Sequence, residues 1–316
     1  MGRRSKNLTD EELRTLQSVS SISDDEAIEI FIRQKRIEGV GDTTVDRYRT
    51  IMRVIHRDLP KINIDKQIIE LSTADIETLI LYWKEIVTLS TLNGRIRVMK
   101  PFYKILTNKK TIPRNPMEHI HQLRERVEIK DTLTDKDVEK IANHLKKRKT
   151  FAGFRDLIIF YLLLDTGIRI GECMNILVGD VEKDRITIIL TKNLQERFVY
   201  PSPKCMKAIR SFIKVRGTIE NVPQLFVTVD NTKLHKRTFQ EVLREAGREC
   251  NIQKDVSPHM LRRTYAKNAV LNGMDAFSLA RLLGHQSLEV TSRYVQIYGT
   301  DLKKQSRLNA NYGKYF

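Results

Sequence analysis

The sequence predicts a mainly helical protein of two domains, with a small antiparallel β-sheet in the C-terminal domain. Three observations support this prediction. Apolar residues recur every three or four positions through most of the chain, as on one face of an amphipathic helix. A charged segment with two prolines, 113–131, interrupts this pattern. Two short apolar runs, 185–190 and 197–201, flank a polar turn, which is typical of a β-hairpin.

The composition indicates a globular protein with a polyanionic partner. The chain has 316 residues, of which 41% are hydrophobic, and a formal net charge of +17. Such a charge favours nucleic acid as the partner over an anionic membrane surface. We expect no membrane segment, because the N-terminus lacks the apolar core of a signal peptide and no apolar run could span a bilayer. The isolated Cys173, Cys205 and Cys250 predict a reduced, cytoplasmic protein.

The N-terminal part reads as a polar lead-in, 1–20, followed by a helical domain, 21–112. Apolar periodicity and capping residues predict helices over 24–39, 43–59, 72–87 and 91–110. The last of these carries several cations around two aromatic residues: Arg95, Arg97, Lys100, Lys104, Lys109 and Lys110 around Phe102 and Tyr103. This pattern fits a face lying along DNA phosphates and equally a solvated helix with an aromatic core side.

Residues 113–131 are predicted to form an interdomain linker, and His119 and His121 within it to lie on its surface. The C-terminal domain is predicted over 132–316. Helices are expected over 133–145, 157–164, 173–181, 203–217, 236–250, 257–273, 275–284 and the final stretch from 285. Thr134 is the expected N-cap of the first, and Pro258 the expected first residue of another.

Three stretches carry polar residues that packing does not require. "TGIRIGE" places Arg169 after a glycine turn, with Glu172 one helical turn on. "HMLRRTYA" places His259 and Arg262 on one helix face. "LGHQSLEVTSRYVQI" contains the last histidine and a tyrosine nine residues later, His285 and Tyr294. Each taken alone fits an ordinary surface or core position.

Together these stretches fit phosphodiester cleavage without a metal. Two guanidinium groups bind phosphate oxygens bidentately and keep their charge. A tyrosine oxygen can attack phosphorus and form a covalent intermediate, provided that a positive, hydrogen-bonded site offsets its ordinary pKa near 10. A lysine or histidine can then protonate the departing sugar oxygen. We find no carboxylate cluster of the kind that a two-metal nuclease uses.

With a lysine from the predicted hairpin, these stretches give the order Arg, Lys, His-x-x-Arg, His, Tyr, which resembles the tyrosine recombinases, also called the phage integrase family. The resemblance is strong over 132–316 and rests only on the helical pattern before it. It implies a C-shaped DNA clamp made of a core-binding domain and a catalytic domain. It also implies Tyr294 as nucleophile, Arg169 and Arg262 as the phosphate clamp, and His259 and His285 as hydrogen-bond or proton-transfer groups.

The resemblance implies Lys192 as the general acid for the 5′ oxygen, and Glu172 as a support for the active site. The family hairpin often reads G-K-G-x-K-x-R, whereas "TKNLQER" here lacks the glycines. Lys183 is therefore an alternative acid. Tyr298 is a rival nucleophile, and it is expected to pack in the core with Leu288, Thr291 and Val295. Tyr265 is also expected to pack, and Arg263 to contact phosphate or lie on the surface.

The family resemblance implies a site-specific recombinase acting through a 3′-phosphotyrosine and a Holliday junction, without metal or other cofactor. The implied partners are a double-stranded DNA recombination site, three further copies in a homotetramer and an accessory DNA-bending protein. The C-terminal tail from 301 fits docking on a neighbouring copy and equally a solvated terminus. Integration or excision of a mobile element is the expected task. The alternatives are Xer-like resolution of plasmid or chromosome dimers, a type IB topoisomerase and a catalytically silent DNA-binding protein.

Overall fold

The chain folds into two compact units, whose boundary falls between Val127 and Glu128. The computed structural model describes residues 22–125, 131–190, 195–285 and 288–298. No helix in these ranges is both long enough and apolar enough to cross a membrane.

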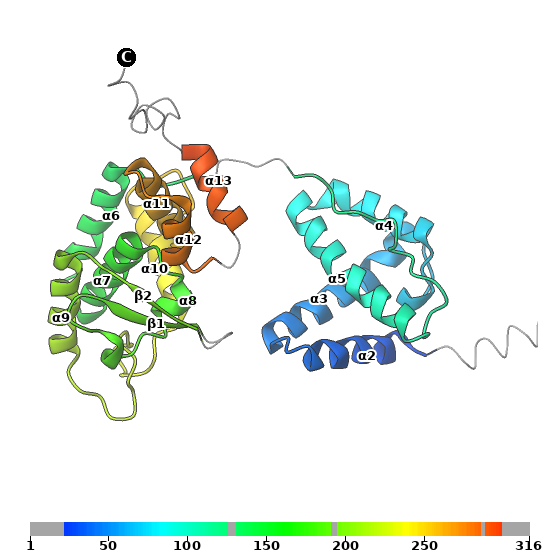
Figure 1. Ribbon diagram of the computed structural model, residues 1–316, viewed down its shortest axis with the longest axis horizontal. Helices are drawn as coiled ribbons and strands as arrows, with labels where there is room; N and C mark the ends of the chain where they lie inside the picture. Colours follow the sequence, from blue (N-terminus) through cyan, green and yellow to red (C-terminus); the bar gives the residue numbers. More distant parts are fainter. Residues whose placement is uncertain (1–21, 126–130, 191–194, 286–287, 299–316) are drawn as a thin grey trace, which may run out of the picture. The chain divides into compact units, whose positions relative to one another are not determined.

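The described part of the first unit is entirely helical (Figure 1). Its α-helices are α2 (Asp24–Ile37), α3 (Asp42–Asp58), α4 (Thr73–Ile86) and α5 (Leu89–Asn108), with the 3-10 helices η1 (Leu59–Ile62) and η2 (Ile68–Glu70) between α3 and α4. Helix α2 packs against α3 and α5, and α4 packs against α5. The four helices predicted for this part of the sequence are thus confirmed.

Capping residues fix where these helices begin. Ser23 precedes α2. Its hydroxyl oxygen accepts a hydrogen bond from the backbone nitrogen of Glu26, and its own backbone nitrogen donates to the Glu26 carboxylate. Ser72 and Asp75 make the same reciprocal pair at the start of α4. Each pair satisfies two of the backbone donors that a helix start leaves unpaired.

The predicted linker begins too early at residue 113. Met117 is buried in the core of the first unit, and Ile120 and Leu123 pack against that core. The side chain of Asn93 on α5 donates to the carbonyl of Leu123 and accepts from its backbone nitrogen, both at 2.8 Å. Residues 113–125 therefore pack on the first unit, because their spaced apolar residues find partners on its helices.

Helix α5 presents two different faces. Phe102 and Tyr103 are fully buried, and the Tyr103 hydroxyl donates to the carbonyl of Ile68 at 2.7 Å. Arg97 and Lys104, seven residues apart, are exposed. The aromatic residues are thus core, and the exposed cations form a separate face.

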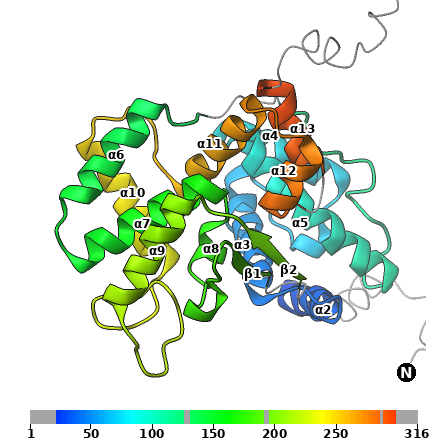
Figure 2. The same cartoon turned by 60° about the vertical axis from the view of Figure 1, so that its left-hand side comes forward.

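The second unit is mixed, and its sheet is small (Figure 2). Its elements are α6 (Asp135–Lys147), α7 (Phe151–Thr166), α8 (Ile170–Cys173), η3 (Val178–Asp180), β1 (Ile186–Leu190), β2 (Gln195–Val199), α9 (Pro203–Arg216), α10 (Lys236–Glu249), α11 (Pro258–Leu271), α12 (Ala276–Leu283) and α13 (Leu288–Tyr298). A mainly helical chain with one small antiparallel sheet is confirmed.

Helix α7 lies inside the second unit, in contact with α6, α9 and α11 (Figures 1 and 2). It is apolar on nearly all sides, as a helix surrounded by other elements must be. Thr134 caps α6 as predicted, accepting from the backbone of Asp137 at 3.2 Å. Cys173 and Cys205 are buried free thiols of this core.

Strands β1 and β2 pair antiparallel, with Ile188 opposite Arg197 and Ile186 opposite Val199. Because side chains alternate along a strand, Arg197 and Val199 share one face of β2 while Phe198 takes the other. Val199 is buried and Phe198 is exposed, so Arg197 lies on the inward face. The predicted hairpin is confirmed, and its inward face carries a charge.

The helix predicted over 173–181 is wrong. Helix α8 ends at Cys173, and the chain then runs beside the segment around residue 224. The backbone of Leu225 donates to Ile176, and that of Val178 donates to the carbonyl of Pro223. These non-local backbone hydrogen bonds replace the helical ones, which local periodicity could not foresee.

Candidate active site

A glycine turn at the end of α7 positions the first arginine. Gly167 has a φ of 63°, and a Cβ on it would lie 2.4 Å from Cδ1 of Tyr265. Only glycine fits this left-handed, closely packed position. The turn exposes the Gly167 carbonyl to Arg262 and places Arg169 directly before α8.

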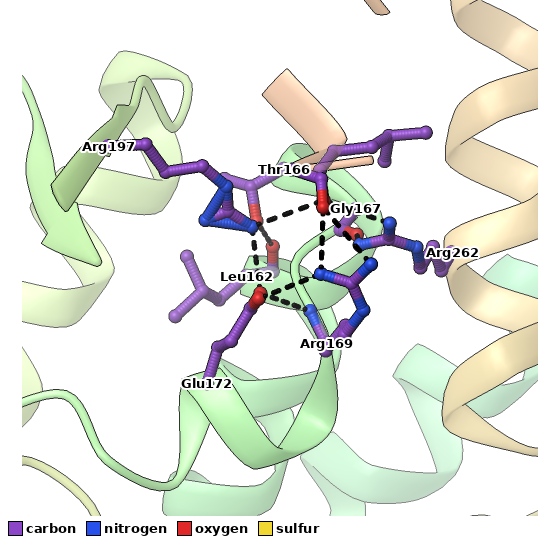
Figure 3. Close-up of polar contacts among 9 residues, drawn as sticks. Leu162, Thr166, Gly167, Arg169, Glu172, Arg197 and Arg262 are labelled. Carbon is purple, nitrogen blue, oxygen red and sulfur yellow. Dashed lines mark hydrogen bonds and ion pairs between the residues drawn. The ribbon is translucent and has the colours of Figure 1, made fainter. Parts of the chain in front are cut away.

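Arg169 is partly exposed and held by two partners (Figure 3). Its Nη1 donates to Oε1 of Glu172 at 3.0 Å, so the predicted Arg–Glu pair is present. Both terminal nitrogens also donate to the carbonyl of Gly284 at 3.1 Å. Since 42% of the side chain remains exposed, the guanidinium is fixed and still accessible to an anion.

Arg262 reaches the same turn from α11. It is only 6% exposed, and donates to the carbonyls of Gly167 at 2.8 Å and Leu283 at 2.9 Å. Burial, together with the nearby charge of Arg169, lowers the pKa of Arg262 to about 10. The guanidinium therefore keeps its charge at neutral pH.

A third arginine, which the sequence analysis did not single out, completes the cluster. Arg197 on β2 donates to Oε2 of Glu172 at 2.7 Å and to the carbonyl of Leu283 at 3.4 Å (Figure 3). Two sequence signals could have found it: an arginine on the inward face of a predicted strand, and the final R of the family hairpin pattern. Three cations and one carboxylate leave this cluster with an excess of positive charge, which suits a phosphate.

His285 follows directly after the turn that the arginines contact. Gly284 ends α12 with a φ of 68°, and Nδ1 of His285 lies 2.8 Å from the hydroxyl oxygen of Thr291 on α13. Burial, followed by the charges of Arg262, Arg169 and Arg197, lowers the pKa of His285 to about 4. The imidazole is therefore neutral at pH 7 and can donate and accept one proton each.

Tyr294 lies on α13, three residues after Thr291, and is half-buried against a cluster formed by α11 and α12. Burial raises its pKa, while the charges of Arg262 and Arg263 act in the opposite direction. The phenol is therefore protonated at neutral pH in the unbound protein. Any attack by its oxygen requires a group that removes this proton.

Comparison with known proteins shows the family of the chain. Residues 131–300 match the phage integrase family. The chain belongs to the phage integrase family. It is 30% identical to the tyrosine recombinase XerC of Chlamydia caviae over 68% of this chain and 70% of that protein. It is 23% identical to XerC of Leptospira interrogans over 91% and 94% of the two chains.

A solved structure of a lambda integrase tetramer bound to a Holliday junction has the same fold. Its TM-score is 0.71 at 15% identity, covering 90% of this chain and 83% of that one. The family resemblance implies two further site residues, His259 and Lys192. His259 is exposed on the first turn of α11, one turn before Arg262, and Lys192 lies outside the described residues.

The other predicted positions are also placed. The ring of Tyr265 packs over Gly167. Tyr298 packs with Val295 against the α11–α12 cluster, with Nζ of Lys267 5.9 Å from its ring centroid. Leu288, expected to pack beside them, is instead 42% exposed at the first turn of α13.

The structure also places Arg263 and Lys183. Arg263 donates to the backbone carbonyl of Asp131 at 3.0 Å. Lys183 is exposed in the segment before β1, where its carbonyl accepts from Arg210. Among the described residues, no group of three or more His, Cys, Asp or Glu is arranged to hold a metal ion.

Proposed function

We propose that this chain is a site-specific DNA recombinase that cuts and rejoins strands through a 3′-phosphotyrosine. The observation that carries the proposal is the convergence of Arg169 and Arg262 on one turn, with Tyr294 on the helix that follows it. Membership of the phage integrase family and the XerC relatives, which are named tyrosine recombinases, support it.

Arg169 and Arg262 hold the non-bridging oxygens of the scissile phosphate. Each terminal guanidinium nitrogen carries two hydrogens. Nη2 of Arg169 and both terminal nitrogens of Arg262 each use one of them on a backbone carbonyl, so each retains one for a phosphate oxygen. Because these donors are fixed before the substrate arrives, they stabilise the charge that builds on phosphorus without further rearrangement.

The phenol oxygen of Tyr294 attacks phosphorus, its proton passes to a histidine of the site, and the bond from phosphorus to the 5′ oxygen of the sugar breaks. The energy of that bond is kept in the phosphotyrosine bond. A free 5′ hydroxyl of a partner strand reverses the step by attacking phosphorus and releasing Tyr294. Neutral His285 and exposed His259 assist by hydrogen bonding or proton transfer. Lys192 protonates the leaving 5′ oxygen, which offsets the high basicity of that alkoxide.

The two units act as a clamp on a double-stranded recombination site, and four copies exchange strands through a Holliday junction. The net charge of +17 and the tetrameric lambda integrase structure support this assembly. The task that we propose is integration or excision of a mobile element in the cytoplasm, with an accessory DNA-bending protein. Xer-like dimer resolution is the alternative, since it uses the same chemistry.

Covalent trapping tests the proposal. The protein is incubated with nicked suicide substrates made from DNA flanking its gene, and the products are resolved on a denaturing gel. We expect a shifted protein–DNA band that disappears in Tyr294→Phe. Tyr298→Phe is the matched control, because it removes the same hydroxyl one helical turn away from Tyr294 and should retain the band.

The other outcomes are equally clear. If no adduct forms while duplex binding is tight, the chain is a silent DNA-binding protein or lacks an accessory factor. If every DNA forms an adduct regardless of sequence, the topoisomerase activity fits better. Loss of the band in Tyr298→Phe alone would exclude Tyr294 as the nucleophile.

A further inference from the structure

We propose that Arg197 is a positioning residue of this site, which holds Glu172 and the turn of Gly284 so that the guanidinium of Arg169 stays aimed at the phosphate. This inference rests on the proposed function. Arg197 lies on the β-hairpin, which is remote in sequence from both of the segments that it contacts.

Glu172 links Arg197 to Arg169 through hydrogen bonds to both residues. Its Oε2 accepts from the backbone nitrogen of Arg169 at 2.9 Å and from Nη2 of Arg197 at 2.7 Å. Its Oε1 accepts from the Arg169 guanidinium at 3.0 Å. The carboxylate therefore sits between two arginines (Figure 3). Without Arg197, Oε2 loses the one charged donor that it has among the described residues, and the carboxylate is held by Arg169 alone.

Arg197 also contacts the second anchor of Arg169. A Cβ on Gly284 would lie 2.7 Å from Nε of Arg197 and 3.2 Å from its Cζ, so the guanidinium lies directly against this glycine. The carbonyl of the same Gly284 accepts both bonds from Arg169. Arg197 thus contacts both Glu172 and Gly284, the two groups that orient the guanidinium of Arg169.

Arg197 acts through these neighbours, because its Nη2 is bonded to Glu172 and to the carbonyl of Leu283. Its Nε and Nη1 are buried and have no hydrogen-bond partner among the described residues. Buried donors without partners cost stability. Because Arg197 has buried donors without partners yet bonds to Glu172, which supports Arg169, its placement is better explained by a role in the site than by stability.

The test compares three single variants by the rate of covalent adduct formation at saturating suicide substrate. Arg197→Met keeps the bulk and removes the charge, and Arg197→Lys keeps the charge and removes the planar fork. Arg185→Met is the matched control. Arg185 directly precedes the same hairpin and is partly exposed, and it pairs with Glu182 at 2.8 Å and stacks over Phe198 instead of the cluster.

We expect Arg197→Met to form the adduct about 10- to 100-fold more slowly, because a misplacement of about 1 Å costs this order in rate. Duplex affinity and the thermal unfolding midpoint should stay close to wild type. Arg197→Lys should recover part of the rate, and Arg185→Met all of it. The loss should also be less than additive with Glu172→Gln: once Glu172 has lost its charge, removing Arg197 disturbs only the contact with Gly284.

The results separate this inference from the proposed function. If wild type forms no adduct, the proposed function fails. If wild type forms it and Arg197→Met matches its rate, the positioning role is wrong. A purely structural role predicts rates that fall in step with the unfolding midpoint, and effects of Arg197 and Glu172 that add. Should Arg197→Met not fold, Arg197→Lys and its double variant with Glu172→Gln decide between these outcomes.

Discussion

The cations of the candidate site are arginines for a physical reason that Arg262 makes plain. Burial and neighbouring positive charge lower its pKa to about 10, which leaves it charged at neutral pH. A lysine starts from about 10.4 and, lowered by a comparable amount, would titrate near pH 8 and begin to lose its charge at physiological pH. A buried anion clamp with several adjacent cations therefore favours guanidinium groups.

His285 gives the folded protein a specific pH dependence. Its pKa falls from the ordinary 6.5 to about 4 on folding, so the unfolded chain takes up this proton first as the pH falls. The free energy of unfolding should therefore decrease between about pH 6.5 and pH 4 through this group. We expect His285→Asn, which can keep a hydrogen bond to Thr291, to show a shallower decrease in denaturant titrations over this range.

The control for this prediction is His235→Asn, which removes an exposed imidazole before α10. It should leave the pH dependence of wild type in place. Equal slopes for wild type and His285→Asn would show that folding does not lower the pKa of this imidazole.

How far the sequence predicts the site depends on the kind of signal that each residue gives. The structure brings together four of the six predicted residues, Arg169, Arg262, His285 and Tyr294. Each stands at a fixed spacing within a short stretch. Arg197 gives no such signal, because its partners lie on α8 and α12, far away in sequence. The catalytic roles of the four predicted residues remain a proposal.

At the scale of elements, the turn between α12 and α13 carries much of the site. Gly284 combines a positive φ with contact to Arg197, whereas Gly273, after α11, has a φ of 87° and open space where a Cβ would be. We expect both Gly284→Ala and Gly273→Ala to lose about 1–2 kcal/mol of stability from the left-handed backbone alone. Only Gly284→Ala should also slow adduct formation, because its methyl group displaces Arg197.

Chemical denaturation and covalent trapping, measured on both variants, check this prediction. The pair is matched in backbone strain, so any difference in rate reports on the contact at Gly284. If the two variants form adduct equally fast, Arg197 can yield to the methyl group without disturbing Arg169. If both are slowed, the loss follows from stability and not from the site.

Local chemistry predicts most elements of this chain and fails where distant segments pair. The N-cap predicted at Thr134 and the apolar periodicity of 24–39 mark helix starts that the structure confirms. The stretch 173–181 carries a helical pattern, yet its backbone bonds to residues 223–225. Nothing in the sequence of 173–181 indicates that it pairs with residues 223–225. The predicted linker starts too early for the same reason: the side chain of Asn93 bonds to the backbone of Leu123, thirty residues away in the sequence.

At the scale of the whole molecule, the chain has two separate hydrophobic cores and a large positive net charge. Each unit has its own buried cluster, with α7 central to the second and the aromatic residues of α5 in the first. An excess of 17 positive charges destabilises a compact chain through self-repulsion, so its presence implies a partner that neutralises it. The exposed cations of α5 are where we expect the first unit to meet DNA phosphates.

The salt dependence of duplex binding tests this face. Arg97 and Lys104 are both exposed and lie two turns apart on α5. If both bind phosphates, replacing them with glutamine should weaken binding at low salt and reduce the slope of log K against log salt by about 0.9 for each phosphate that is no longer neutralised. The control changes two exposed cations on α2 and α4, Arg36→Gln and Lys84→Gln, and should leave the slope near that of wild type. Equal reductions in both double variants would mean that net charge alone drives binding, and that α5 is a solvated helix whose cations keep the surface soluble.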